Sequence, residues 1–427
     1  MPNEDDLRAA FRSLAAQAPA AASVLTAVRQ SPPPRAFSPR GRWPLIRRLL
    51  IPFSAAAAIV AVVACVTAIA GRTHDRGAGA SARQLLRRAP RYYLELVGDS
   101  VNGPYHAIIR DTVTGATLAA AWPPRPFWSF SAVAGGSDDR TFVLAAQRHD
   151  EPAPVAQRKL FIARFNPADG RLIISALPIP EFPMQVTVTG IALSPGAGTL
   201  AVALGTGRRQ TQAQIRVYSL LTGAVRVWQA PGFVGAPDVA NSITWGPAGI
   251  LAVNYLDSLP GSISVRLLNT RTAGGSLLAD SRLVICSKQP GGFQFSGNGV
   301  LTPDGKKIVA PAWRLNGWKS AAPPCTPGAA GARSRLNSAA LGSALTSEYR
   351  EFSAASGRPT GILYRTRTMN YSVLWASSSG SVLVVEARRP GAPKSALNPV
   401  YGVVAGQRFV PVRRSPAGSV ATAMAAF

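Results

Sequence analysis

Histidine is too sparse in this chain to build a metal or hydrolase site. The 427 residues contain three, His74, His106 and His149, and no two of them are spaced as metal ligands. Sites of that kind use histidines on one turn of helix or in a short Cys/His motif. The sequence therefore predicts no metal centre.

Two pairs of acidic residues could in principle bind a cation or transfer protons. They are Asp138-Asp139 and Asp150-Glu151. Carboxylate pairs do serve both purposes, but Asp is also common in turns, where it accepts hydrogen bonds from the main chain. Because both pairs lie between apolar runs, we predict that they are solvated turn residues.

Two glycine-containing motifs also lack the context that chemistry needs. In GTGRR, at residues 205–209, no helix and no Lys-Ser/Thr follows the glycines, as phosphate binding requires. Ser377-Ser378-Ser379-Gly380 follows Ala376, where a nucleophile elbow has Gly. The chain is therefore predicted not to be an enzyme, with no catalytic residues and no cofactor.

An uncharged segment near the N-terminus has the length of a membrane span. Residues 49–70 are 22 consecutive uncharged residues, which would form a helix of about 33 Å. Five Arg in residues 34–48 against three in residues 72–86 favour a cytoplasmic N-terminus. Two alternatives are a signal peptide cleaved after Ala68-Ile69-Ala70 and a lipoprotein box at Cys65. The prediction is a single-pass cell-membrane protein whose residues beyond 71 are extracytoplasmic.

Residues 92–427 consist of short apolar runs divided by turns, which is typical of an all-β domain. Two kinds of turn alternate strictly along the chain. Their positions are 115, 139, 170, 198, 223, 249, 274, 305, 357, 380 and 406. Without an insertion at about 316–347, each of six copies has about 51 residues, close to a four-stranded propeller blade. We predict a six-bladed β-propeller closed by a C-terminal strand.

Two segments resemble the WD-repeat-like propeller families. These are Thr302-Pro-Asp-Gly-Lys-Lys-Ile-Val309 and the run from Ser194 to Ala201. No Trp-Asp pair ends a strand, since Trp228 is followed by Gln229. Three further segments, DDLRAAFRSLAAQAP, DDRTFVLAAQR and EFSAASGR, resemble actinobacterial single-pass membrane proteins. That resemblance implies the same layout and no particular activity.

The predicted domains are a cytoplasmic segment of short helices and basic linker (1–48), a transmembrane helix (49–70), a juxtamembrane linker (71–91) and the propeller (92–427). Leu7, Phe11 and Leu14 share one face of a predicted helix in the first segment. Trp128, Trp245 and Trp375 precede equivalent turns, and we predict that they belong to the core between blades; the alternative is a platform for a ligand.

Two features of the propeller segment could relate to binding. Cys286 and Cys325 are the only cysteines beyond the predicted membrane helix, so an exported domain could join them in a disulfide; the alternative is two free thiols. The insertion contains Trp318, Lys319, Arg333 and Arg335. A long loop that the ring does not need is a candidate binding element, or else a surface loop without a role in binding.

Charge suggests the class of partner. Residues 92–427 contain 32 basic and 16 acidic residues, an excess of 16 positive charges. We therefore predict a non-enzymatic module that binds a protein, a peptide or an anionic envelope component, with no nucleic-acid partner. The alternatives are a transmembrane regulator with an anti-sigma-like layout and, third, an enzyme that uses clustered acids in the propeller channel.

Overall fold

The computed structural model divides the chain into two units, residues 1–79 and 80–427. Only the second contains described residues. They are 82–98, 104–148, 158–183, 186–206, 212–234, 242–256, 263–286, 288–289, 293–295, 298–315, 345–366, 370–377, 382–387, 400–405, 407–412 and 420–426. The following account concerns these residues.

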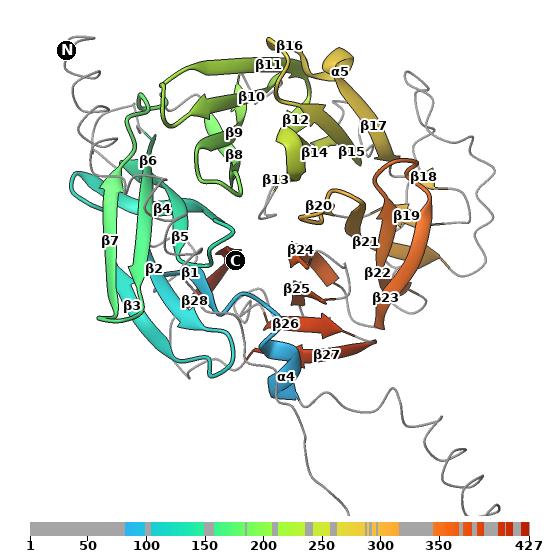
Figure 1. Cartoon of the computed structure of the whole chain (residues 1–427), viewed down its shortest axis with the longest axis horizontal. Helices are drawn as coiled ribbons and strands as arrows, with labels where there is room; N and C mark the ends of the chain where they lie inside the picture. The colour runs from blue at the N-terminus through green and yellow to red at the C-terminus, as the bar shows by residue number, and fades with distance from the viewer. Residues whose placement is uncertain are drawn as a thin grey trace, which may run out of the picture. The chain divides into compact units, whose positions relative to one another are not determined.

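The strands form six hydrogen-bonded sheets placed around a common centre (Figure 1). Sheet 1 joins the two ends of the unit, with the order β28-β1-β2-β3, and sheet 2 has the order β4-β5-β6-β7. The bounds in these two sheets are β1 Tyr92–Gly98, β2 Tyr105–Asp111, β3 Thr117–Ala121, β28 Val420–Ala426, β4 Phe127–Gly135, β5 Thr141–Arg148, β6 Arg158–Asn166 and β7 Arg171–Ala176.

Sheets 3 and 4 have five strands each. Sheet 3 has the order β16-β11-β10-β9-β8; sheet 4 has the order β12-β14-β15-β17, with β13 also paired to β14. Their bounds are β8 Thr187–Leu193, β9 Thr199–Thr206, β10 Gln212–Ser219, β11 Val225–Pro231, β16 Gly275–Ser276, β12 Phe233–Val234, β13 Ile243–Trp245, β14 Ile250–Leu256, β15 Ile263–Asn269 and β17 Ser281–Cys286.

Sheet 5 has six strands, in the order β18-β19-β21-β22-β23 with β20 paired to β21, and sheet 6 has the order β24-β25-β26-β27. Their bounds are β18 Lys288–Gln289, β19 Phe293–Phe295, β20 Val300–Leu301, β21 Lys307–Leu315, β22 Leu345–Ser353, β23 Pro359–Thr366, β24 Asn370–Ala376, β25 Val382–Ala387, β26 Val400–Ala405 and β27 Arg408–Pro411. Two short α-helices, α4 (Ala82–Leu86) and α5 (Leu277–Asp280), and one 3₁₀ turn, η2 (Pro247–Gly249), complete the described elements.

The innermost strands pack against one another in a ring. Each contacts the next in the order β28, β4, β8, β13, β20, β24, and β24 contacts β28. The apolar residues lie mainly between neighbouring sheets. One cluster joins Leu94 and Ile109 of sheet 1 to Phe130 and Phe142 of sheet 2, and another joins Trp228 of sheet 3 to Val253 of sheet 4. This arrangement of sheets around a centre is that of a β-propeller.

The predicted turns are confirmed where the structure describes them. Positive φ angles occur at or next to ten of the eleven predicted positions. They are found at Gly115, Asp139, Gly170, Ala197, Gly223, Ala248, Gly249, Gly274, Gly305, Gly357 and Gln407, among others. Most carry Gly because a left-handed residue without a side chain avoids a steric penalty.

The predicted fold class is wrong in other respects. Only five of the six sheets are each drawn mainly from one stretch of chain, because sheet 1 takes its innermost strand from the C-terminus, and sheets 3, 4 and 5 carry more than the four strands expected. Short extra strands such as β16, which pairs in parallel with β11 of the preceding blade, have too few residues to show an alternating pattern. The predicted pairing of the C-terminal strand with the first strand is present, since Leu94 lies opposite Ala426 and Gly98 opposite Val420.

No described helix is both long and apolar enough to cross a membrane. The transmembrane helix predicted at residues 49–70, the helices of residues 1–48 and most of the linker at 71–91 lie outside the described residues. The linker's last part forms α4, whose Leu85 and Leu86 pack with Tyr93, Tyr401 and Val403 between sheets 6 and 1. A short helix here was not predicted, because five residues are too few for a clear helical period.

Two turn glycines with the same backbone angle test how tightly blades are packed. Gly357 and Gly170 both have φ +68°, but a Cβ on Gly357 would lie 1.9 Å from the carbonyl oxygen of Val284 in the neighbouring blade, whereas one on Gly170 would meet nothing closer than 3.7 Å. Gly357→Ala should cost about 2–4 kcal/mol and Gly170→Ala about 1 kcal/mol. Urea unfolding of both variants measures this, and equal losses would contradict the close approach.

Candidate functional site

The ring has two faces, which the strand connections define. On one, called here the turn face, lie the turns from each first strand to the second and from each third strand to the fourth. On the other, the loop face, lie the connections from second to third strands and from one blade to the next. Neighbouring strands of a blade are antiparallel. The turns from first to second strands and from third to fourth strands therefore all lie on the same side of the ring.

Main-chain hydrogen bonds join the turns of one blade to each other in a repeated way. A residue at or just after the end of the third strand donates its N–H to a carbonyl in the first turn. The pairs are Phe165 to Arg140, Leu220 to Gly198, Thr270 to Gly249 and Ala354 to Lys306, all at 2.8–3.0 Å. In sheet 1, Thr112 donates to the carbonyl of Arg91 at 2.8 Å. The chain therefore enters the propeller on the turn face, with Arg91 in the place of a turn residue.

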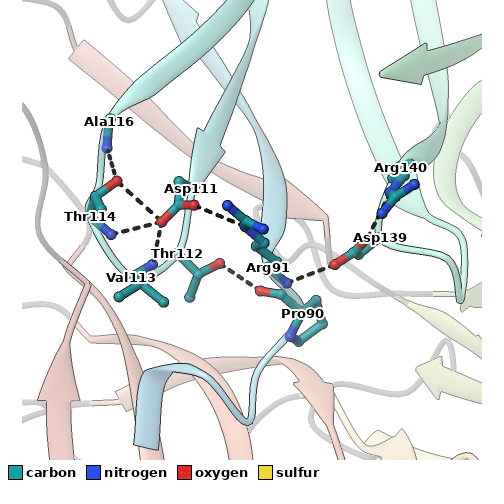
Figure 2. A network of polar contacts seen from close by, with 9 residues as sticks. All are labelled: Pro90, Arg91, Asp111, Thr112, Val113, Thr114, Ala116, Asp139 and Arg140. Atoms are coloured by element: carbon teal, nitrogen blue, oxygen red, sulfur yellow. Dashed lines mark hydrogen bonds and ion pairs between the residues drawn. The ribbon is translucent and has the colours of Figure 1, made fainter. Parts of the chain in front are cut away.

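Figure 2 shows that Asp111 and Asp139 accept hydrogen bonds from residues in and next to these turns. Asp111 Oδ1 accepts from Val113 N at 2.9 Å, from Thr114 N at 2.8 Å and from Thr114 Oγ1 at 3.1 Å. Its Oδ2 lies 3.4 Å from Arg91 Nε. Burial alone would raise the pKa of Asp111, but the hydrogen bonds from Thr114, Arg91 and Val113 outweigh it and the pKa lies below its usual value.

The pair Asp138-Asp139 has the turn role that the sequence predicts. Asp138 Oδ1 accepts from Thr141 N at 2.9 Å and Oδ2 from Thr141 Oγ1 at 2.7 Å. Asp139 Oδ2 accepts from Arg91 N at 2.8 Å and so links sheet 2 to sheet 1 (Figure 2). Asp150 and Glu151 lie outside the described residues. No described cluster of His, Cys, Asp or Glu could hold a metal ion.

The other charged clusters are ion pairs inside single blades. In sheet 1, Arg110 Nε lies 2.8 Å from Glu95 Oε2, and both side chains are almost completely buried. In sheet 5, Glu348 pairs with Arg350 at 2.6 Å and with Arg365 at 2.9 Å. Lys307 also pairs with Glu351 at 2.9 Å. Each acid in these clusters has a cationic partner on the same or an adjacent strand, so we interpret the clusters as structural.

The innermost strands carry no charged residue within their described bounds. Their sequences are FWSFSAVAG, TVTGIAL, ITW, VL, NYSVLWA and VATAMAA for β4, β8, β13, β20, β24 and β28. The hypothesis of an enzyme in the propeller channel requires clustered acids there. Over the six described inner strands those acids are absent, which leaves that hypothesis without support from them.

The predicted binding residues of the insertion cannot be placed. Trp318, Lys319, Arg333 and Arg335 lie in residues 316–344, outside the described residues, as does Cys325. The ends of this segment are described: Leu315 lies opposite Leu345 in the β21–β22 pairing, at the loop face. Cys286, the last residue of β17, is disulfide-bonded.

The three tryptophans predicted for the core differ from one another. Trp245 packs against the cluster between sheets 3 and 4, and its Nε1 donates to Ala192 O at 2.8 Å. Trp375 packs between sheets 6 and 1. Trp128 is instead 38% exposed, and Trp122, six residues earlier, is 56% exposed. The core interpretation is therefore wrong for Trp128. Trp122 directly follows β3 and Trp128 is the second residue of β4, so both lie at the ends of the connection between sheets 1 and 2, at the loop face.

Comparisons with known proteins concern the fold. No family model and no curated protein matches the chain. Among solved structures, an oligogalacturonate lyase in complex with manganese is 12% identical, with a TM-score of 0.42, over 74% of this chain and 71% of that one. A TolB homologue from Agrobacterium tumefaciens is 11% identical, with a TM-score of 0.42, over 76% and 89%. The β-propeller domain of the Trilobed protease from Pyrococcus furiosus is 10% identical, with a TM-score of 0.37, over 68% and 72%.

Lowering the pH should reduce the stability of the fold, because the Asp111 carboxylate accepts hydrogen bonds from Val113 and Thr114 in the turn after β2. Since its pKa is lowered in the folded state, its contribution to stability is complete above the unfolded pKa of about 3.9 and is lost as the pH falls through the folded value. Asp111→Asn should cost about 1–2 kcal/mol at pH 7, and the gap to wild type should narrow as the pH falls through the lowered pKa of Asp111. Urea unfolding over a series of falling pH values measures this, with Asp169→Asn, on an exposed turn, as control. A gap that persists in acid would contradict the assignment.

Proposed function

We propose that the propeller is a non-enzymatic binding or scaffold module that works outside the cytoplasm and binds an anionic envelope component, a protein or a peptide. The observation that carries the location is the disulfide at Cys286. Structural disulfides persist in oxidising compartments and are rare in the cytosol. The predicted partner is Cys325, and an envelope location agrees with the predicted single-pass topology, which stays a prediction.

The binding role is supported by how the polar residues are used. On the turn face, Asp111, Asp138 and Asp139 accept hydrogen bonds within the scaffold. The buried acids Glu95 and Glu348 are paired with Arg110 and Arg350. The six described inner strands contain no Asp, Glu, His, Lys or Arg. What the chain has in excess is positive charge, 32 basic residues against 16 acidic ones beyond residue 91. A surface of that kind favours anionic partners.

The location is tested by labelling thiols in intact cells. In a Cys65→Ala background, a membrane-impermeant maleimide should label the chain only after reduction and without permeabilisation, because Cys286 and its partner are oxidised and outside. Labelling that requires permeabilisation would place the propeller in the cytoplasm and overturn this part of the proposal. A Cys286→Ser variant is the control, and it should show one labelled thiol fewer after reduction.

Binding is tested with isolated cell-envelope fragments. The purified full-length chain should co-sediment with them at about 50 mM salt and be released at about 1 M, since screening weakens attraction between exposed charges. Absence of co-sedimentation at low salt would contradict an envelope ligand. Soluble fragments of envelope polymer released by the chain during incubation would instead indicate an enzyme.

A further inference from the structure

The two exposed tryptophans lie at the two ends of one connection on the loop face. Seven large hydrophobic side chains are exposed among the described residues, and Trp122 and Trp128 are the aromatic ones. Trp122 begins the short connection of residues 122–126, in which Arg125 is also exposed, and Trp128 follows it in β4. Exposed aromatic groups that the scaffold does not bury mark sites of interaction. We call Trp122, Arg125 and Trp128 the tryptophan platform.

The platform is held in place by its surroundings. The His106 ring stacks on the Trp122 indole, with 4.5 Å between centroids and an interplanar angle of 27°. Phe127 N donates to Pro124 O at 2.9 Å, which closes a turn in the chain between the two tryptophans, and the Phe127 ring meets Phe161 edge-on at 5.3 Å. Tyr105 N donates to Ser129 Oγ at 2.9 Å, and this joins the strand of His106 to that of Trp128. A platform fixed before binding loses little conformational entropy when a ligand arrives.

The geometry of Trp122 restricts the kind of ligand. One face of its indole is covered by His106, and more than half of the side chain is still exposed. A ligand therefore stacks flat on the outer face. Pyranose rings present such a flat face of C–H groups. A proline-rich peptide would need aromatic side chains on both sides of a groove, so the one-sided platform favours a sugar.

Charge adds a preference for an anion. Arg125 is exposed within the platform, and Arg148 lies opposite Phe127 in the β4–β5 pairing. Nearby in sheet 2, Lys159 is already paired with Glu181 at 3.6 Å, and Arg158 donates to Val186 O. The exposed guanidinium of Arg125 can bind a carboxylate or a phosphate through two parallel hydrogen bonds.

We propose that the tryptophan platform is a subsite for an anionic polysaccharide, with sugar rings stacked on Trp122 and Trp128 and an acidic substituent bound by Arg125. This rests on the proposed function, because it names the ligand class and the place where an envelope component binds. It differs from the earlier prediction, which placed binding in the insertion.

The test uses the purified full-length chain and two polymers in isothermal titration calorimetry. The probes are alginate, a linear uronate polymer, and dextran, which is neutral. Trp122→Ala should weaken alginate binding at least tenfold. Arg125→Ala should weaken it about fivefold and remove most of its salt dependence. The matched controls are Leu221→Ala and Arg271→Ala, two exposed residues on turns of the opposite face, and both should bind as wild type does.

The outcomes separate this proposal from the proposed function. If wild type binds alginate and both Trp122→Ala and Trp128→Ala bind it equally well, the platform is not the subsite, although the binding function stands. Equal affinity of wild type for dextran and alginate would overturn the anionic preference. Binding of a decaproline peptide that Trp122→Ala abolishes, with no binding of alginate, would assign the platform to a peptide. Unchanged thermal unfolding of the variants excludes a folding defect as the cause.

Discussion

The ring depends on one pairing between strands more than three hundred residues apart in sequence. Tyr92–Gly98 lies antiparallel to Val420–Ala426, and the C-terminal strand in turn contacts β4 and β24 on either side. Without this pairing sheet 1 would lack its innermost strand and expose an unpaired edge, which promotes aggregation. The other sheets form their main pairings from nearby residues. The β1–β28 pairing therefore costs the largest loss of chain entropy of the strand pairings described here. It also closes the ring, so that every sheet packs against a neighbour on both sides.

Among the ion pairs of the described residues, the most deeply buried one, Glu95 with Arg110, lies in the same sheet. Its two residues are on adjacent strands, and Arg110 also donates to Thr117 Oγ1 at 3.0 Å, so the pair spans three strands. Removing one member would leave a buried charge without its partner, which is strongly destabilising. A shifted register would do the same. The pair therefore fixes the register of β1, β2 and β3. These strands belong to the sheet that takes its innermost strand from the far end of the chain.

The sequence predicts the parts of this structure that depend on local chemistry. Turn residues such as Gly115, Gly170 and Gly357 are recognisable because left-handed backbone favours Gly in most contexts. Short strands such as β16 and the helix α4 could not be predicted, because segments of two to five residues are too short to show an alternating or helical pattern. The exposure of Trp128 was missed for another reason: tryptophans before equivalent turns look alike in sequence, and burial is decided by the neighbouring blade. The Pro-rich run between Trp122 and Trp128, which no strand needs, was the available signal.

The two faces differ in how much of their chemistry the scaffold uses. On the turn face, repeated main-chain bonds such as Phe165 to Arg140 and Leu220 to Gly198 tie consecutive turns, and Ser137 Oγ reaches Pro195 O of the next blade at 2.7 Å. Few groups there can change without a loss of stability. On the loop face, the connections between strands range from a few residues to the 29 between Leu315 and Leu345. Variation in length and sequence at that face leaves the strand pairings intact. A binding surface is therefore least costly to build on the loop face, where Trp122 and Trp128 lie.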